Sequence, residues 1–272
     1  MHIYLDTANI KEIEAAQSAM RNAGTLLDGI TTNPTTASAY SKETGMKPKD
    51  VFLRIADMVN GPVSVETLGC SSYNPEDITT EMLMDEAFEI AEWHPRFVVK
   101  MPCTPEGVEA TQLLSSDFPP VPVNMTLVFS EQDALCTAHA GARYCSPFVG
   151  RIEDRVPGEG FRTAESICRM YREMKFPTDV LFASARDPDY VRRAHKMGAH
   201  ICTVPYKVFT SMDPAEVREM QENPLHYTPE STYSKRFEIY EPTKSGMAAE
   251  LREAGLKRFL DDARGAGYRI IE

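Results

Sequence analysis

The chain has 272 residues, of which 42% are hydrophobic and 25% charged, and its 40 acidic side chains outnumber 29 basic ones to give a net charge of −11. This composition excludes disordered and fibrous structure, and the negative charge disfavours nucleic acid and anionic membrane surfaces as partners. No apolar run approaches the roughly 20 residues of a membrane span, and the first residues lack a signal-peptide pattern, so we expect a cytoplasmic protein.

The cysteines and histidines form no recognisable metal motif. The chain has six of each, without a C-x-x-C, H-x-H or H-E-x-x-H pair. Metal ligands usually occur at such spacings, whereas scattered cysteines in a cytoplasmic chain are usually buried thiols. We therefore expect free, buried thiols and no bound metal.

Eight short apolar runs recur along the chain, each followed by a polar or Gly/Pro break and a stretch with helical periodicity. The runs lie at 2–5, 28–31, 62–66, 96–101, 121–127, 143–149, 178–184 and 200–204. This alternation indicates βα units, and continuous apolar strands are typical of a parallel sheet that is covered on both faces.

Helix boundaries follow three of these runs. Thr104 precedes a proline after the fourth run, Ser130 is a candidate N-cap after the fifth, and Gly141 closes that helix. Asp187 and Gly198 bracket the helix after the seventh run. Because eight units permit closure and about 250 residues suffice for such a domain, the sequence predicts a single (β/α)8 TIM barrel of class α/β.

Active sites of these barrels lie at the carboxyl ends of the strands, and seven of the eight runs deliver a polar side chain there. These residues are Asp6, Thr31, Asn33, Glu66, Lys100, Asn124, Thr126, Ser146, Arg151, Ser184 and Arg186. Each one alone has an ordinary structural explanation, as a helix cap, a turn residue or a surface charge.

Lys100 is the hardest of them to explain structurally, because it lies inside the apolar run FVVKMP. It either extends its amine to solvent, pairs with a carboxylate, or serves as a nucleophile. An amine in dry surroundings loses its proton more easily and can attack a carbonyl to form a Schiff base. Asp6 and Glu66 would then supply the proton transfers needed to cleave a carbon–carbon bond next to a ketone.

Arg151, Ser184 and Arg186 form a second subset. Two guanidinium groups and a hydroxyl on neighbouring strand ends suit capture of a phosphate or a similar oxyanion, which barrels often bind beside their last strands. The alternative is that the arginines pair with nearby acids such as Asp154 and Asp187.

These residues also belong to longer motifs. The stretches are LDTAN at 5–9, DGITTNP at 28–34, VSVE at 63–66, VVKMPCTPEGVEA at 98–110, NMTLVFS at 124–130, SPFVGRIED at 146–154 and ASAR at 183–186. In these motifs, and in their order over nearly the whole chain, the sequence resembles the transaldolase family. The resemblance implies a TIM barrel with a metal-free class I aldol mechanism that needs no cofactor.

The resemblance also implies roles for individual residues. Lys100 matches the lysine that forms the Schiff base, and Asp6 matches the carboxylate that moves the proton of the C4 hydroxyl. Glu66 matches an acid/base residue that works through a water, and Thr126 a hydroxyl that helps to hold that water. The positions that match the dihydroxyacetone site are Thr31, Asn33, Asn124 and Ser146, and those that match the phosphate site are Arg151, Ser184 and Arg186.

Two positions bear on the type of reaction. The family's aldolase branch, which releases free dihydroxyacetone, usually has Gln in place of Glu66 and Tyr in place of Phe148, so both residues favour the transferase branch. The implied reaction transfers a dihydroxyacetone unit from a ketose phosphate to an aldose phosphate, in the pentose phosphate pathway. The alternatives are a sulfo-sugar transaldolase, a fructose 6-phosphate aldolase-type lyase and, more remotely, a catalytically silent sugar-phosphate-binding barrel.

The sequence departs from the family pattern in two places. Ala185 stands where the family usually has Phe, which we expect to widen the pocket. Segment 225–248 resembles an insertion, so that 1–224 forms the barrel and 249–272 the C-terminal helix and tail of the same domain. The resemblance further implies a homo-oligomer, either a decamer or a dimer.

Overall fold

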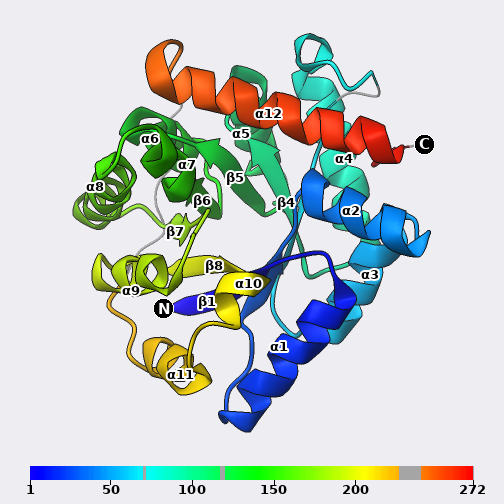
Figure 1. Cartoon of the computed structure of the whole chain (residues 1–272). Helices are drawn as coiled ribbons and strands as arrows, with labels where there is room; N and C mark the ends of the chain where they lie inside the picture. Colours follow the sequence, from blue (N-terminus) through cyan, green and yellow to red (C-terminus); the bar gives the residue numbers. More distant parts are fainter. Residues whose placement is uncertain (70–71, 117–119, 227–239, 272) are drawn as a thin grey trace.

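The computed structural model describes residues 1–69, 72–116, 120–226 and 240–271. Its eight parallel strands close into one barrel in the order β1 to β8, ringed by helices (Figure 1). The strands are β1 (His2–Asp6), β2 (Gly29–Thr31), β3 (Val63–Glu66), β4 (Phe97–Pro102), β5 (Val123–Val128), β6 (Tyr144–Pro147), β7 (Asp179–Phe182) and β8 (Ile201–Pro205). Each lies within or overlaps one of the eight apolar runs, and the predicted TIM barrel is confirmed.

The helices lie outside the barrel. They are α1 (Ile10–Asn22), α2 (Pro34–Thr44), α3 (Pro48–Met58), the 3-10 helix η1 (Pro75–Asp77), α4 (Thr80–Trp93), α5 (Pro105–Leu114), α6 (Glu131–His139), α7 (Val149–Arg155), α8 (Glu159–Met174), α9 (Pro188–Lys196), α10 (Tyr206–Phe209), α11 (Pro214–Glu222) and α12 (Gly246–Ala266). The predicted caps are confirmed: the side chains of Thr104, Ser130 and Asp187 accept the backbone N–H groups at the starts of α5, α6 and α9.

Two buried tyrosine side chains meet inside the barrel, below the carboxyl ends of the strands. Tyr4 lies on the same face of β1 as Asp6, two residues earlier, and its hydroxyl is 3.3 Å from that of Tyr144 on β6. A Cβ at Gly29 would lie 2.8 Å from the Tyr4 ring, so this position of β2 accommodates only glycine. These contacts pack the interior of the barrel below the carboxyl ends of the strands.

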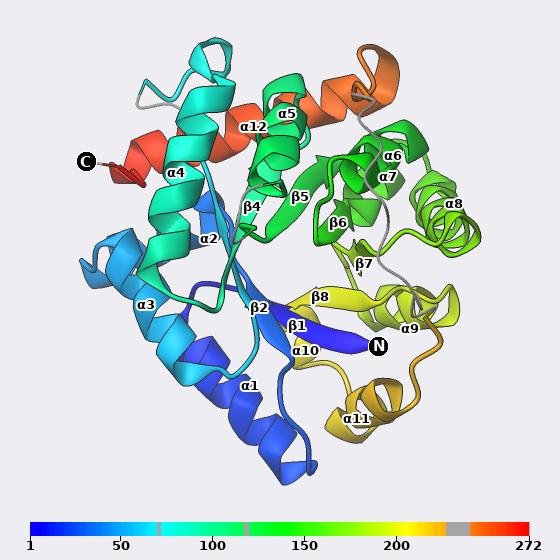
Figure 2. The ribbon, with the colours of Figure 1, turned by 180° about the vertical axis from the view of Figure 1, so that it is seen from behind.

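Helix α12 runs past α5 and α4 toward α2, as both views show (Figures 1 and 2). A buried ion pair anchors it, because Arg252 Nη1 lies 3.0 Å from Asp133 Oδ1 of α6. The same Asp133 oxygen accepts the backbone N–H of Thr243 at 2.9 Å, just before the helix. Beyond the other end of α12, the hydroxyl of the buried Tyr268 donates to the backbone carbonyl of Glu66 at 3.4 Å.

The expectations about free cysteines, membrane spans and the insertion can be compared with the structure only over the described residues. Five cysteines, at positions 103, 136, 145, 168 and 202, are free and buried, while Cys70 lies outside the described residues. Among the described residues no helix is long and apolar enough to cross a membrane. Of segment 225–248, residues 227–239 lie outside the described part, and α12 already begins at Gly246.

Candidate active site

A cavity of about 240 Å³ opens at the carboxyl ends of the strands. Its lining residues are Asp6, Thr31, Asn33, Thr35, Thr36, Lys100, Asn124, Ser146, Phe148, Arg151, Leu181, Ala183, Ser184, Ala185, Arg186, Thr203, Pro205, Arg258 and Phe259. The structure thus brings the predicted site residues together around one cavity, except for Glu66 and Thr126, which do not line it.

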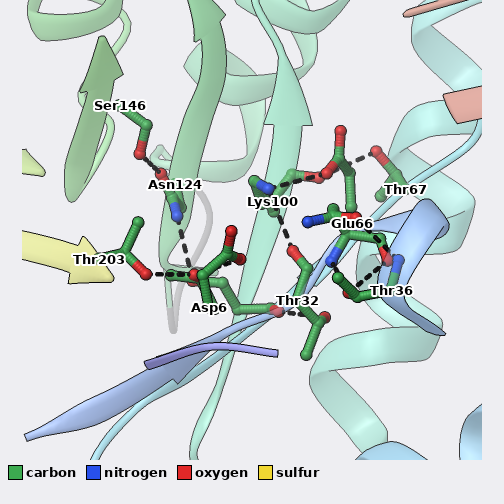
Figure 3. Close-up of polar contacts among 12 residues, drawn as sticks. Asp6, Thr32, Thr36, Glu66, Thr67, Lys100, Asn124, Ser146 and Thr203 are labelled. Carbon is green, nitrogen blue, oxygen red and sulfur yellow. Dashed lines mark hydrogen bonds and ion pairs between the residues drawn. The ribbon is translucent and has the colours of Figure 1, made fainter. Parts of the chain in front are cut away.

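Lys100 points inward from β4 and is almost completely buried, with 5% of its surface exposed. Parallel pairing places it beside Glu66 of β3 on one side and Asn124 of β5 on the other. Its Nζ lies 2.9 Å from Glu66 Oε2 and donates to the backbone carbonyl of Thr32 at 3.0 Å (Figure 3). The pairing with a carboxylate that the sequence left open is therefore present, and the paired amine still borders the cavity.

Glu66 lies next to Lys100, away from the cavity surface. Burial raises the pKa of the Glu66 carboxyl, and the neighbouring charge of Lys100 opposes that rise. The hydroxyl of Thr126 is also buried and has no hydrogen-bond partner among the described residues. The structure shows direct contact between the carboxylate and the amine, and leaves one buried hydroxyl unsatisfied on β5.

Asp6 faces the cavity from the end of β1. Its Oδ1 accepts a hydrogen bond from Thr31 Oγ1 at 2.9 Å, and Thr31 Oγ1 also lies 2.5 Å from Thr203 Oγ1 of β8. Loss of solvation raises the pKa of the Asp6 carboxyl, while the charge of Lys100 and hydrogen bonds from Thr31 and Asn33 lower it. The amine of Lys100 therefore lies between one carboxyl that borders the cavity, Asp6, and one behind it, Glu66, and burial makes both carboxyls more basic than usual.

A chain of amide and hydroxyl groups links β6, β5 and β3 beside Lys100 (Figure 3). Ser146 Oγ donates to Asn124 Oδ1 at 2.6 Å, and Asn124 Nδ2 donates to Ser64 Oγ at 3.1 Å. Asn33 is not part of this chain and serves as a helix cap: its side-chain oxygen accepts the N–H of Thr36 at the start of α2. These contacts fix the amide orientations before any ligand binds.

The arginine end of the cavity includes the loop after β7 and helix α7, which pack closely together. Ser184 adopts a left-handed backbone with φ of 65°, and Gly150 lets α7 approach it, because a Cβ there would lie 2.1 Å from the carbonyl oxygen of Ser184. Arg151 packs its guanidinium over the rings of Phe148 and Phe259, at 5.0 and 5.4 Å. It makes no ion pair with the part of the chain that the structure describes.

Arg186 takes part in both arrangements that the sequence allowed, an ion pair with a nearby acid and the lining of the cavity. Its Nη2 lies 2.5 Å from Asp154 Oδ2, so this ion pair exists, yet the guanidinium also lines the cavity. Both side chains are about half exposed, and exposed pairs of this kind contribute little stability. Asp187, the other acid considered, instead caps α9.

Sequence reasoning missed several lining residues. Thr203 comes from the eighth run, and its polar side chain near the end of HICTV was the available signal. Arg258 and Phe259 come from α12, whose place over the cavity depends on tertiary packing and left no local signal.

Taken together, the site has the groups that carbonyl chemistry requires: a buried amine, two carboxyls for proton transfer, hydroxyl and amide donors, and cations at one end. Among residues 1–69, 72–116, 120–226 and 240–271, no group of three or more His, Cys, Asp or Glu side chains is arranged to hold a metal ion.

Comparison with known proteins gives consistent matches. Residues 3–270 match the family described as Transaldolase/Fructose-6-phosphate aldolase. A "Probable transaldolase" of Aquifex aeolicus (strain VF5) is 41% identical over 212 residues, which cover 78% of this chain and 88% of the relative. A "Probable transaldolase" of Thermoanaerobacter sp. (strain X514) is 35% identical over 99% of this chain and 100% of its own length.

A solved structure supports the fold alone. It is that of a candidate fructose-1,6-biphosphate aldolase from Coccidioides immitis, with a TM-score of 0.50 and 13% identity, covering 98% of this chain and 90% of that one.

Proposed function

The chain belongs to the transaldolase/fructose-6-phosphate aldolase family and is an enzyme of the transferase class, and from that premise we propose that it transfers a dihydroxyacetone unit from a ketose phosphate to an aldose phosphate through a Schiff base on Lys100. The observation that carries the proposal is the contact of 2.9 Å between Lys100 Nζ and Glu66 Oε2 at the edge of a cavity that also holds Asp6.

Imine formation is the first step of the proposed reaction. Lys100 passes a proton to Glu66 and its neutral amine attacks the C2 carbonyl of the ketose. Glu66 then returns the proton to the carbinolamine hydroxyl, which leaves as water and gives the iminium. The raised pKa of Glu66 suits this exchange, because proton transfer is most effective when donor and acceptor are closely matched. The unpartnered hydroxyl of Thr126 supports a water position beside it.

Carbon–carbon cleavage is assigned to Asp6. Its carboxylate removes the proton of the C4 hydroxyl, the C3–C4 bond breaks, and the electron pair moves into the iminium to give an enamine. The aldose phosphate leaves, a second aldose phosphate enters, and the enamine attacks its aldehyde carbon while Asp6 returns the proton. Water then hydrolyses the new iminium and releases the product ketose and free Lys100.

The other lining residues are proposed to hold the substrate. Thr31, Asn33, Asn124 and Ser146 surround the amine and would bind the hydroxyls of the dihydroxyacetone portion, while Arg151, Ser184 and Arg186 would bind the phosphate. Phe148 lies over Lys100, with its ring 6.0 Å from Nζ, and would shield the imine from water. Glu66 and Phe148 also favour transfer over release of free dihydroxyacetone.

Further proposals rest on family membership and on the sequence pattern rather than on the geometry of the site. They are a role in the pentose phosphate pathway, a cytoplasmic location and assembly as a homo-oligomer.

Borohydride trapping tests the proposed chemistry. We expect incubation with fructose 6-phosphate and borohydride to add a reduced dihydroxyacetone group to Lys100, identified by peptide mass mapping. Lys100→Met removes the amine and should abolish trapping while the variant still folds, as its circular dichroism spectrum can show. An adduct on a different lysine, or none in the wild type, would contradict the proposal.

A further inference from the structure

The arginine end of the cavity holds three guanidinium groups from three separate elements. Arg151 belongs to α7 and Arg186 to the loop between β7 and α9, whereas Arg258 comes from α12. The third arginine is brought to this place only because α12 lies across the cavity. It has no part in the anion site that the sequence motifs define.

Positive charge is in excess at this end. Arg186 is paired with Asp154, and Arg258 Nε lies 3.8 Å from Asp262 Oδ2, while Arg151 has no ion pair among the described residues. Burial lowers the pKa of Arg151, and the like charges of Arg258 and Arg186 lower it further, with Arg258 the larger contributor of the two. Arg151 is thus close enough to each of the other two cations to be repelled by it, and an anion placed among the three relieves that repulsion.

Arg258 is available to bind such an anion. A separation of 3.8 Å from Asp262 is too long for a hydrogen bond, and the side chain of Arg258 is 63% exposed. Asp262 is itself engaged by Thr35 of α2, whose hydroxyl lies 2.5 Å from the same carboxylate oxygen. The carboxylate therefore ties α12 to α2 and keeps Arg258 at the rim without occupying the donors of its guanidinium.

We propose that Arg258 is a specificity-determining residue that makes the cavity prefer a phosphate dianion to a sulfonate monoanion. A phosphate monoester carries a charge of about −1.5 to −2 at pH 7, whereas a sulfonate carries only −1. Because Coulomb attraction is proportional to the ligand's charge, each added cation favours the phosphate. The inference rests on the proposed function, since it names the substrate class of that same site.

The test compares Arg258→Gln with the control Lys257→Gln. Lys257 is adjacent on α12 and similarly exposed, at 68%, but it pairs with Asp261 and does not line the cavity. The assay measures kcat/KM for fructose 6-phosphate and for the 6-sulfonate analogue of the same ketose, with one acceptor. Both substitutions lie on the exposed side of a helix, so both variants should fold.

We expect Arg258→Gln to lower kcat/KM for the phosphate about 10- to 30-fold, which is the typical effect of losing one charge-assisted hydrogen bond. If the effect scales with ligand charge, the sulfonate loses about the square root of that factor, roughly 3- to 5-fold. The preference for phosphate then falls about 3- to 5-fold, while Lys257→Gln changes either value less than twofold. Equal losses for both substrates, no loss for either, or the same losses in the control would overturn the inference.

Two further measurements separate this inference from the proposed chemistry. Dihydroxyacetone carries no anion, so its borohydride trapping on Lys100 should be the same in wild type and Arg258→Gln; failure to trap in the wild type concerns the proposed function only. Calorimetric binding of inorganic phosphate and of methanesulfonate needs no turnover. Arg258→Gln should weaken the phosphate more than the sulfonate, and unchanged binding of both would contradict the assignment of Arg258.

Discussion

At the scale of single residues, the site depends on the different surroundings of its two carboxyls. Glu66 contacts the amine of Lys100 directly and lies behind the cavity surface, whereas Asp6 borders the cavity and is held by Thr31. Burial raises the pKa of both groups. One carboxyl is therefore placed to exchange protons with the amine, and the other to reach a hydroxyl of the substrate.

Asp6 and Glu66 variants should separate these two tasks. We expect Asp6→Asn to lower the rate of ketose cleavage by about 100- to 10,000-fold while dihydroxyacetone is still trapped on Lys100, because the general base acts only on the C4 hydroxyl. Glu66→Gln should slow the trapping itself. The measurement is the trapping rate with dihydroxyacetone beside kcat for the ketose. Equal loss of trapping in both variants would show that the two carboxyls do not have separate roles.

At the scale of elements, α12 completes the cavity, and its attachment depends on a buried charge pair. Arg252 and Asp133 are both almost inaccessible, at 7% and 0% side-chain exposure, and the aspartate also accepts the N–H groups of Phe129 and Thr243. A second pair joining the helix to α7, between Arg155 and Glu250, is exposed. The two pairs connect the same helix to the barrel in very different dielectric surroundings.

Breaking the buried pair should therefore cost much more than breaking the exposed one. Arg252→Ala leaves a buried carboxylate without its cation, which typically costs about 3 to 5 kcal/mol of unfolding free energy. Arg155→Ala should cost under about 1 kcal/mol. Urea denaturation of the two variants against wild type gives the comparison. Similar losses in both would mean that the Arg252 pair does not hold α12 in place.

At the scale of the whole molecule, one buried acid links stability to pH. Glu86 of α4 accepts the backbone N–H groups of Leu68 and Gly69, in the loop that leaves β3 just after Glu66. Burial raises the pKa of Glu86 from 4.5 to about 7, against the opposing effect of these two hydrogen bonds. The folded chain therefore binds a proton at this site that the unfolded chain releases.

The sign of the effect follows from that difference. Stability contributed by Glu86 is fully present below pH 4.5 and is lost as the pH rises to about 7, by a total of about 3 kcal/mol. Glu86→Gln removes this titration. The unfolding free energy of the variant should therefore rise relative to that of wild type as the pH increases from 4.5 to 8. Asp85→Asn, at an exposed neighbouring position, is the control. Parallel pH profiles for Glu86→Gln and wild type would show that Glu86 does not titrate in this range.

The sequence alone determined the barrel and most of the cavity. Alternation of apolar runs with capped helices predicts eight βα units, and closure of those units brings all the strand ends to one rim. The sequence alone therefore predicts that Lys100, Asp6 and Arg151 lie together, because position along a strand fixes which end of the barrel a side chain occupies. Thr203 was equally accessible to this reasoning, at the end of the eighth run.

Only the tertiary structure decided what lies across that rim. Arg258 and Phe259 reach the cavity because a buried pair and Tyr268 hold α12 over α2 and β5, and helical periodicity does not reveal which face of the barrel a terminal helix will cover. The same holds for the pairing of Arg186 with Asp154 and for the direct contact between Lys100 and Glu66. Such contacts depend on side-chain distances between elements, and those are set by packing rather than by local sequence.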